Sequence, residues 1–165
     1  MRIQMKAIVP DKLFDEKKIR DEIKKTLKEV TGKKLQKDFK ATVKTWDNKP
    51  RFPSKIRSRK DSIAVIVYPT GPNKDQYYYV HEGTKPRKIV PRKPGGLLWF
   101  QPGYTPATRR RVIGSGQAMR SGPFVPAKMI RRHSIEPREF STAIAKKQKK
   151  PFRQDIQRAI SRAVD

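Results

Sequence analysis

The chain has 165 residues, and its 41 lysines and arginines against 15 aspartates and glutamates give a formal net charge of +26. This length fits one domain, or one domain with extended arms. Apolar residues make up 35% of the chain and charged residues 34%, which indicates a small core with much of the chain outside it. The absence of cysteine excludes disulfide bonds, thiolate metal sites and thiol nucleophiles.

The positive charge favours a polyanionic partner. At +26, self-repulsion opposes compaction unless a polyanion or partner surfaces offset it. We expect non-specific nucleic-acid binding that weakens steeply with salt, without base-specific recognition, because no reading motif is recognisable. No apolar run approaches the roughly 20 residues that span a bilayer, and the first residues lack a signal peptide's apolar segment. The sequence therefore predicts a soluble protein made in a cytoplasm, with no membrane partner.

The first third of the chain predicts a short strand followed by a long helix. Apolar residues alternate with polar ones at Ile3, Met5 and Ala7, and the segment 1–10 ends at Pro10, as in an edge strand. Asp11 or Asp15 offers a helix N-cap. Over residues 11–46, apolar residues recur every three to five positions, which is typical of one helical stripe: Ile19, Ile23, Leu27, Val30, Leu35, Phe39, Val43 and Trp46. Gly32 interrupts this helix and predicts a bend or a break.

The middle of the chain, residues 62–135, predicts a small antiparallel sheet. SIAVIVY (62–68) has the composition of a buried central strand, and a turn at PTGPNKD connects it to a second strand at YYYVHEGT (77–84). LLWF (97–100) and FVPAKMIRR (124–132) predict further strands. Between them, residues 101–122 show no sustained period, so we expect a flexible arm or loop.

The C-terminal residues 137–164 predict a second helix, because six apolar residues are spaced by multiples of four: Phe140, Ile144, Phe152, Ile156, Ile160 and Val164. Pro151 is expected to kink or divide this helix. The whole order predicts a single α+β domain over 1–165. In it, a small antiparallel sheet packs against the long N-terminal helix and the C-terminal helix, with a long basic loop attached.

Acidic residues are absent from a long part of the chain. After Glu82 the next is Glu136, and twelve lysines and arginines lie between them. Their partner must be water, a carboxylate elsewhere in the fold, a neighbouring subunit or phosphate. Loop arginines suit docking by a mobile arm, which singles out four residues for partner contacts: Arg109, Arg110, Arg111 and Arg120.

Catalytic chemistry finds little support. The two histidines, His81 and His133, lie near Glu82 and Glu136 in sequence and suggest a metal or nuclease site, but such sites usually cluster several carboxylates. Neither a phosphate-binding GxxxxGK[S/T] loop nor GxSxG is present. The aromatic residues 77–79 and 99–100 are more typical of a core or interface than of base stacking. We expect no catalytic residue, no metal and no cofactor, and so no enzyme.

Two segments together resemble a known family. YYVHEGTKPRKIVPRKPGGLLWF is similar to the pattern of tail-completion, or head–tail joining, proteins of long-tailed phages: a Tyr-rich strand ending in Val-x-Glu/Phe-Gly-Thr, a basic Ile-x-Pro segment and an aliphatic-aromatic strand. The matching residues are Val80, Glu82, Gly83, Thr84, Ile89, Pro91, Leu97 and Phe100. HSIEPREF resembles the family's second landmark, His-Pro-Gly-x-x-Pro-Arg-x-Phe, at His133, Pro137, Arg138 and Phe140.

The chain also departs from the family pattern. Ser134 and Ile135 replace the usual Pro-Gly of the second landmark. KPRFPSKIRSRKDSI stands where the family commonly has a Pro-x-x-Thr-Gly-x-Leu segment, and residues 101–122 are long for the family.

The resemblance implies a structural virion protein of the head–tail neck, assembled in the bacterial host cytoplasm. It implies a homo-oligomeric ring, hexameric or dodecameric, around viral DNA and against other neck, portal-side and tail-tube proteins. Five basic residues become candidates for facing DNA or a neighbouring ring: Lys85, Arg87, Lys88, Arg92 and Lys93. The alternative is a monomeric, ribosomal or nucleoid-like nucleic-acid-binding protein, which explains the charge but not the two motifs.

Overall fold

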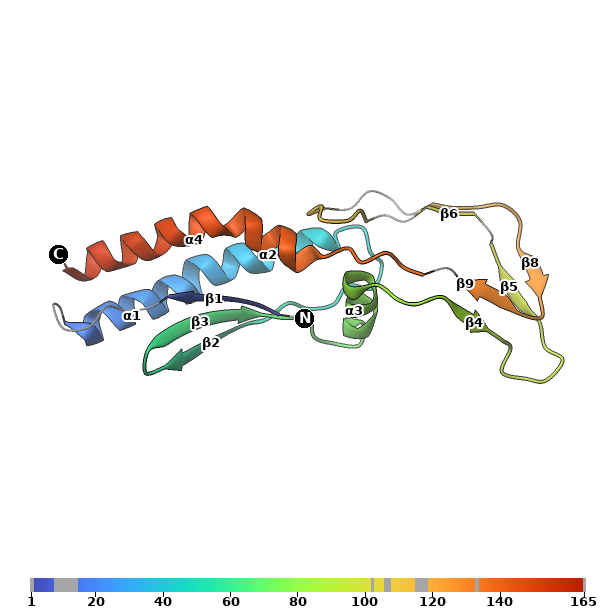
Figure 1. Ribbon diagram of the computed structural model, residues 1–165, viewed down its shortest axis with the longest axis horizontal. Helices are drawn as coiled ribbons and strands as arrows, with labels where there is room; N and C mark the ends of the chain where they lie inside the picture. The colour runs from blue at the N-terminus through green and yellow to red at the C-terminus, as the bar shows by residue number, and fades with distance from the viewer. Residues whose placement is uncertain are drawn as a thin grey trace.

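The computed structural model describes residues 2–7, 15–101, 103–105, 108–114, 119–132 and 134–164. The fold is α+β, as predicted, and its helices and small antiparallel sheets form an elongated molecule (Figure 1). The elements in chain order are β1 (Ile3–Ala7), α1 (Glu16–Thr26), the π-helical turn η1 (Leu27–Thr31), α2 (Gly32–Thr42), β2 (Ser54–Arg59), β3 (Ser62–Val67), α3 (Lys74–Glu82), β4 (Arg87–Ile89), β5 (Leu98–Phe100), β6 (Gly103–Thr105), β7 (Met119–Ser121), β8 (Val125–Ala127), β9 (Ile130–Arg132) and α4 (Phe140–Val164).

The predicted N-terminal helix is present as α1, η1 and α2 in succession. The carboxylate of Asp15 caps it by accepting a bond from the Lys18 amide at 3.1 Å, whereas Asp11 lies outside the described residues. Gly32 does not break the helix. Its amide bonds to the Leu27 carbonyl, five residues back, and so closes a π-helical turn. A Cβ on Gly32 would lie 3.0 Å from that carbonyl, a tight contact, and 3.5 Å from Val65, an ordinary one, so this glycine relieves crowding within the π-helical turn.

The main sheet has three antiparallel strands in the order β1-β3-β2, with β3 in the centre and β1 at an edge, as predicted. Alternation along β3 points Ile63, Val65 and Val67 into the core, and all three are fully buried. Figure 1 shows α1, α2 and α4 on one face of this sheet. These elements together supply most of the core: Ile19, Ile23, Leu27, Leu35, Phe39, Ile63, Val65, Val67, Phe140 and Ile144.

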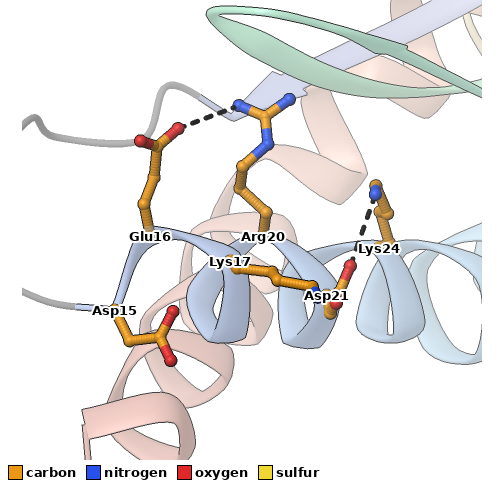
Figure 2. A pocket seen from close by; sticks show the side chains of 6 residues that line it. All are labelled: Asp15, Glu16, Lys17, Arg20, Asp21 and Lys24. Atoms are coloured by element: carbon orange, nitrogen blue, oxygen red, sulfur yellow. Dashed lines mark hydrogen bonds and ion pairs between the residues drawn. The ribbon is translucent and has the colours of Figure 1, made fainter.

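The strand that pairs with β3 in a hairpin is β2, and this corrects the sequence-based interpretation. Residues 54–59, for which no strand was predicted from the sequence, form the partner strand, and the turn lies at Lys60 and Asp61. Arg20 of α1 holds this turn. Its Nη2 donates to the Arg59 carbonyl at 2.5 Å, and its Nη1 donates to the Lys60 carbonyl. Along α1, Figure 2 shows Arg20 paired with Glu16 and Lys24 paired with Asp21.

The expected strand at YYYVHEGT is also wrong, because residues 74–82 form α3. Tyr77 and His81, four positions apart, are buried, while Tyr79 is 53% exposed. A strand would have placed Tyr77 and Tyr79 on the same face, so the burial follows helical spacing. Tyr77 is fully buried against the rings of Phe39, Phe52 and Phe140.

The C-terminal helix α4 passes through Pro151 undivided. It runs back along α2 and α1 (Figure 1), and buried polar groups join the helices. Asp38 of α2 accepts bonds from Lys147, at 2.5 Å, and from Gln148. Asp155 of α4 accepts from Lys34 at 2.8 Å. Among the described residues, none of these helices is both long and apolar enough to cross a membrane.

Candidate functional site in the arm and at its base

The described residues between 84 and 135 form a two-stranded antiparallel ribbon, and we call this part of the chain the arm. Its pairs are β4 with β9, β5 with β8 and β6 with β7, and a bridge between Thr84 and Ile135 closes it at the base. Figure 1 shows β4, β9, β5 and β8 leading away from the helices, and β6 running back towards them. The predicted strands at 97–100 and 124–132 therefore belong to this ribbon and not to the main sheet.

The base of the arm is where the two motif segments meet. Gly83 has φ +80° and ψ 176°, a conformation that glycine alone adopts readily. A Cβ there would lie 2.6 Å from the Ile135 carbonyl and 2.9 Å from Pro137. The Arg138 amide donates to the Val80 carbonyl at 3.1 Å, and the Thr84 amide donates to the Ile135 carbonyl at 3.0 Å. Residues far apart in sequence thus fix the direction in which the arm leaves the helices.

His81 caps α4 from outside that helix. Its Nδ1 accepts a hydrogen bond from the Phe140 amide at 3.1 Å, and its Nε2 lies 3.3 Å from the Ser141 hydroxyl. An accepting Nδ1 requires the neutral ring. Burial lowers the pKa of His81 in agreement with this, although the Glu82 carboxylate opposes the shift. Both ring nitrogens are therefore used in holding the base together.

The tip of the arm, residues 108–114, returns to the base. Arg110 donates to Glu139 at 2.6 Å, and Arg111 donates to the other carboxylate oxygen of Glu139 at 2.5 Å. These bonds lower the pKa of Glu139. The Arg111 amide also donates to the Arg138 carbonyl at 2.8 Å, and Ile113 packs against the core cluster. Two arginines of the acid-free arm are therefore paired with a carboxylate elsewhere in the fold. This is one of the four kinds of partner that the sequence allowed.

The predicted site residues fall into separate groups. Arg109 is exposed at the tip, while Arg110 and Arg111 are tied to Glu139. Arg120 lies on β7, and its side chain is outside what the structure describes. Five further basic residues are exposed just before β4, along it and in the loop after it: Lys85, Arg87, Lys88, Arg92 and Lys93.

The arm also exposes large apolar side chains, which the sequence-based interpretation did not single out. Trp99 of β5 is 64% exposed and Phe124, just before β8, is 61% exposed. The register sets Trp99 opposite Pro126, so strand alternation places Trp99, Phe124 and Leu97 on one face of the ribbon. We call these three residues the apolar arm face. Leu98 and Phe100, on the other face, are half-buried.

No hydrolytic centre forms from the described residues. Within the ranges that the structure describes, no group of three histidine, aspartate or glutamate residues is placed to hold a metal. His133, a residue of the second motif, lies outside the described residues. The hollow on α1 drawn in Figure 2 is lined by acids and bases, two pairs of which neutralise each other, so it offers no concentrated charge to a ligand.

Comparisons with known proteins leave the geometry as the guide to function. No family model, no curated protein and no solved structure matches this chain. One signal for the anchoring carboxylate was nonetheless visible in sequence: Glu136 and Glu139 are the first acids after the long acid-free stretch. The exposure of Trp99 and Phe124 carried no such signal, because strand aromatics are usually buried.

Proposed function

We propose that this protein is a structural subunit of the head–tail neck of a tailed bacteriophage, and that it assembles into a ring around the DNA channel. The observation that carries the proposal is the arm. It leaves the helices at a rigid base built by the two motif segments, and it presents the apolar arm face. Monomeric proteins rarely expose such clustered apolar surface, which usually marks an interface with a partner.

The partner we assign to the apolar arm face is a neighbouring copy of the chain. Repetition of one head-to-tail contact around a closed rotation gives a ring, hexameric or dodecameric here, in which each arm lies on the next subunit. Aromatic residues such as Trp99 supply much of the binding energy at contacts of this kind, commonly about 2 kcal/mol or more each. The role is structural, without catalysis, because the groups at the base serve to hold its backbone in place.

The basic residues of the arm have a place in this proposal. Lys85, Arg87, Lys88, Arg92 and Lys93 face the DNA in the channel, an adjoining ring of the neck, or the portal-side and tail-tube proteins. A monomeric nucleic-acid-binding protein is the second candidate, favoured by the net charge of +26. It gives no role to the apolar arm face, and for that reason we place it second.

The test compares two variants of the purified, nuclease-treated protein. Replacing Trp99 and Phe124 by serine removes the two aromatic side chains of the apolar arm face without touching the core, and should convert rings to monomers of unchanged far-UV circular dichroism. Tyr79→Ser is the matched control, because Tyr79 is an exposed aromatic residue on α3, away from the arm. In the phage that encodes the chain, the double variant should give filled heads and complete tails that stay separate in electron micrographs. Normal joining by that variant would contradict the proposal.

A further inference from the structure

The outer face of the main sheet carries cations in two rows. Alternation places Lys55, Arg57 and Arg59 of β2 on the face opposite the helices. Arg2 and Lys6, at and beside β1, share that face. All five side chains are exposed. The register shows the rows flanking one central line of the sheet, because Lys6 and Arg57 both lie beside Ala64.

Between these rows lie the outward-facing residues Ala64 and Ile66 of β3, which are apolar and yet buried from solvent. Ala64 is 3% exposed and Ile66 is 7% exposed, although α1, α2 and α4 pack on the opposite face. Long basic side chains such as those of the flanking rows can bury their aliphatic stems along an apolar line and keep their charges in water. An open groove of about 770 Å³ lies here, and its lining combines cations with two tyrosines: Arg2, Lys55, Arg57, Ile66, Tyr68 and Tyr78.

The strands of this face contribute no acidic side chain. None of β1, β2 and β3 contains an aspartate or glutamate. In the described part of the chain, none of the five cations of the face forms an ion pair, in contrast to Arg110 and Arg111 of the arm. A cluster of cations held side by side on a rigid sheet is destabilised by mutual repulsion. A bound polyanion relieves it.

We propose that this outer sheet face, defined by Arg2, Lys6, Lys55, Arg57 and Arg59, binds the phosphate backbone of duplex DNA. The two rows lie about 10 Å apart, twice the spacing of neighbouring strands. Cations of the β2 row lie about 7 Å apart, whereas Gln4 separates Arg2 from Lys6 in the β1 row and doubles that spacing. Such a broad array suits a continuous phosphate backbone, whereas acidic protein surfaces mix charges of both signs. Lysine, arginine and tyrosine side chains are the usual phosphate contacts, and they carry no sequence information.

The inference rests on the proposed function in one respect, the neck as the place where the protein meets DNA. The binding of DNA by the sheet face does not require a ring. It also differs from the sequence-based expectation, which placed DNA contacts at Lys85 and its neighbours on the arm. The segment 54–59 contained the signal, because its basic residues fall at every second position, the period of a strand with one cationic face.

The test measures the salt dependence of binding to a 30-base-pair duplex of arbitrary sequence by fluorescence anisotropy. Lys55→Gln/Arg57→Gln should reduce the steepness of log Kd against log salt by about 1.8, and weaken binding at 0.1 M salt by about tenfold or more. The matched control is Lys33→Gln/Lys37→Gln, which removes the same charge from exposed positions on α2. The control should bind with nearly the wild-type slope.

Equal losses in the two variants would overturn the inference, because charge alone would then explain binding. An unchanged Lys55→Gln/Arg57→Gln variant would overturn it too, as would competition by poly-glutamate as effective as that by unlabelled duplex. Labelling of the wild-type chain with an amine-reactive reagent gives a second readout, in which DNA should protect Lys6 and Lys55 but not Lys33 and Lys37. If rings form normally but the duplex does not bind this face, the inference is wrong and the proposed function is unaffected.

Discussion

At the scale of single residues, His81 shows how a motif that suggested chemistry serves structure instead. Its Nδ1 accepts from the first amide of α4, a group that a helix leaves without an internal partner. Its position in α3 therefore ties the start of one helix to the end of another. The neutral form makes this bond, and the imidazolium cannot, since both of its nitrogens carry protons.

This arrangement predicts a pH dependence of stability. Burial puts the pKa of His81 in the folded protein below 6.5, its unfolded value, so the unfolded state binds the proton more readily. The contribution of His81 to the free energy of unfolding is complete above pH 6.5 and is lost as the pH falls towards the folded pKa. Thermal melts from pH 8 to pH 5 should show this loss in the wild type and not in His81→Gln. A His133→Gln variant controls for the other histidine.

Gly83 yields a second prediction at this scale. Gly83→Ala forces a side chain into an unfavourable backbone conformation and against the Ile135 carbonyl, 2.6 Å away. We expect a loss of at least about 2 kcal/mol in the free energy of unfolding, measured with urea. Gly95→Ala is the control, because its φ is +74° but no atom lies within 4 Å of the added carbon. The control should lose only about 1 kcal/mol, and equal losses would argue against the close approach at Gly83.

At the scale of elements, the contact between α2 and α4 depends on buried polar pairs as well as on apolar packing. Asp38 is 4% exposed and Gln148 is 5% exposed, and the Gln148 amide donates to one carboxylate oxygen of Asp38 while Lys147 donates to the other. An unpaired amide at this position would lose its bonds to water without replacement. The pair therefore fixes how α4 lies along α2.

The corresponding prediction is a double-mutant cycle. Asp38→Leu should lower the free energy of unfolding by about 2 kcal/mol, because it leaves the Gln148 amide buried without an acceptor. Adding Gln148→Leu should restore most of that loss, since two apolar side chains leave no group unsatisfied. Urea denaturation measures both. A double variant less stable than Asp38→Leu would show that the loss has another cause.

The helices were predictable from sequence because their apolar residues repeat over many turns, as Ile19, Ile23 and Leu27 do along α1 and into η1. The structures of the two segments that flank β3 in sequence were not predictable: residues 54–59 form the strand β2, and residues 74–82 form the helix α3. Three successive tyrosines favour a strand locally, but the buried site between Phe39, Phe52 and Phe140 accepts Tyr77 and His81 at helical spacing. The strand β2 was hidden because its outward residues are all basic and only Ile56 is apolar.

The site was predictable only in part. The two motifs marked the residues of the base, yet nothing in sequence indicated that residues 80–84 and 135–141 bond to each other. Arg110 and Arg111 were expected to contact a partner, and their bonds to Glu139 depend on the fold of the whole arm. Exposure of Trp99 likewise follows from tertiary structure, since a ribbon of two strands has no second layer to cover both faces.

At the scale of the whole molecule, the arm is a loop closed on its own base. Glu139→Ala should release the tip, because it removes the acceptor shared by Arg110 and Arg111. Hydrogen exchange should then speed up at the Arg111 amide, which bonds to the Arg138 carbonyl, while amides within α2 stay protected. Glu136→Ala is the comparison, since Glu136 lies 3.9 Å from Arg110 and makes the weaker contact. Equal acceleration in both variants would contradict the anchoring role of Glu139.

Contacts through the apolar arm face and contacts with DNA should respond differently to salt. The apolar arm face has no charge at its centre, so contacts through it persist when salt is raised. The proposed binding of DNA through the cations of the sheet and arm should weaken steeply under the same change. Assembly and DNA binding are therefore distinguishable on one protein sample.

The mass of the purified, nuclease-treated protein at low and high salt tests the central claim most directly. We predict a closed ring, either alone or on addition of the tail or portal components, with a mass that high salt leaves unchanged and that Trp99→Ser/Phe124→Ser reduces to a monomer. A chain that stays monomeric with those components, and forms large species only with DNA at low salt, would contradict the neck proposal.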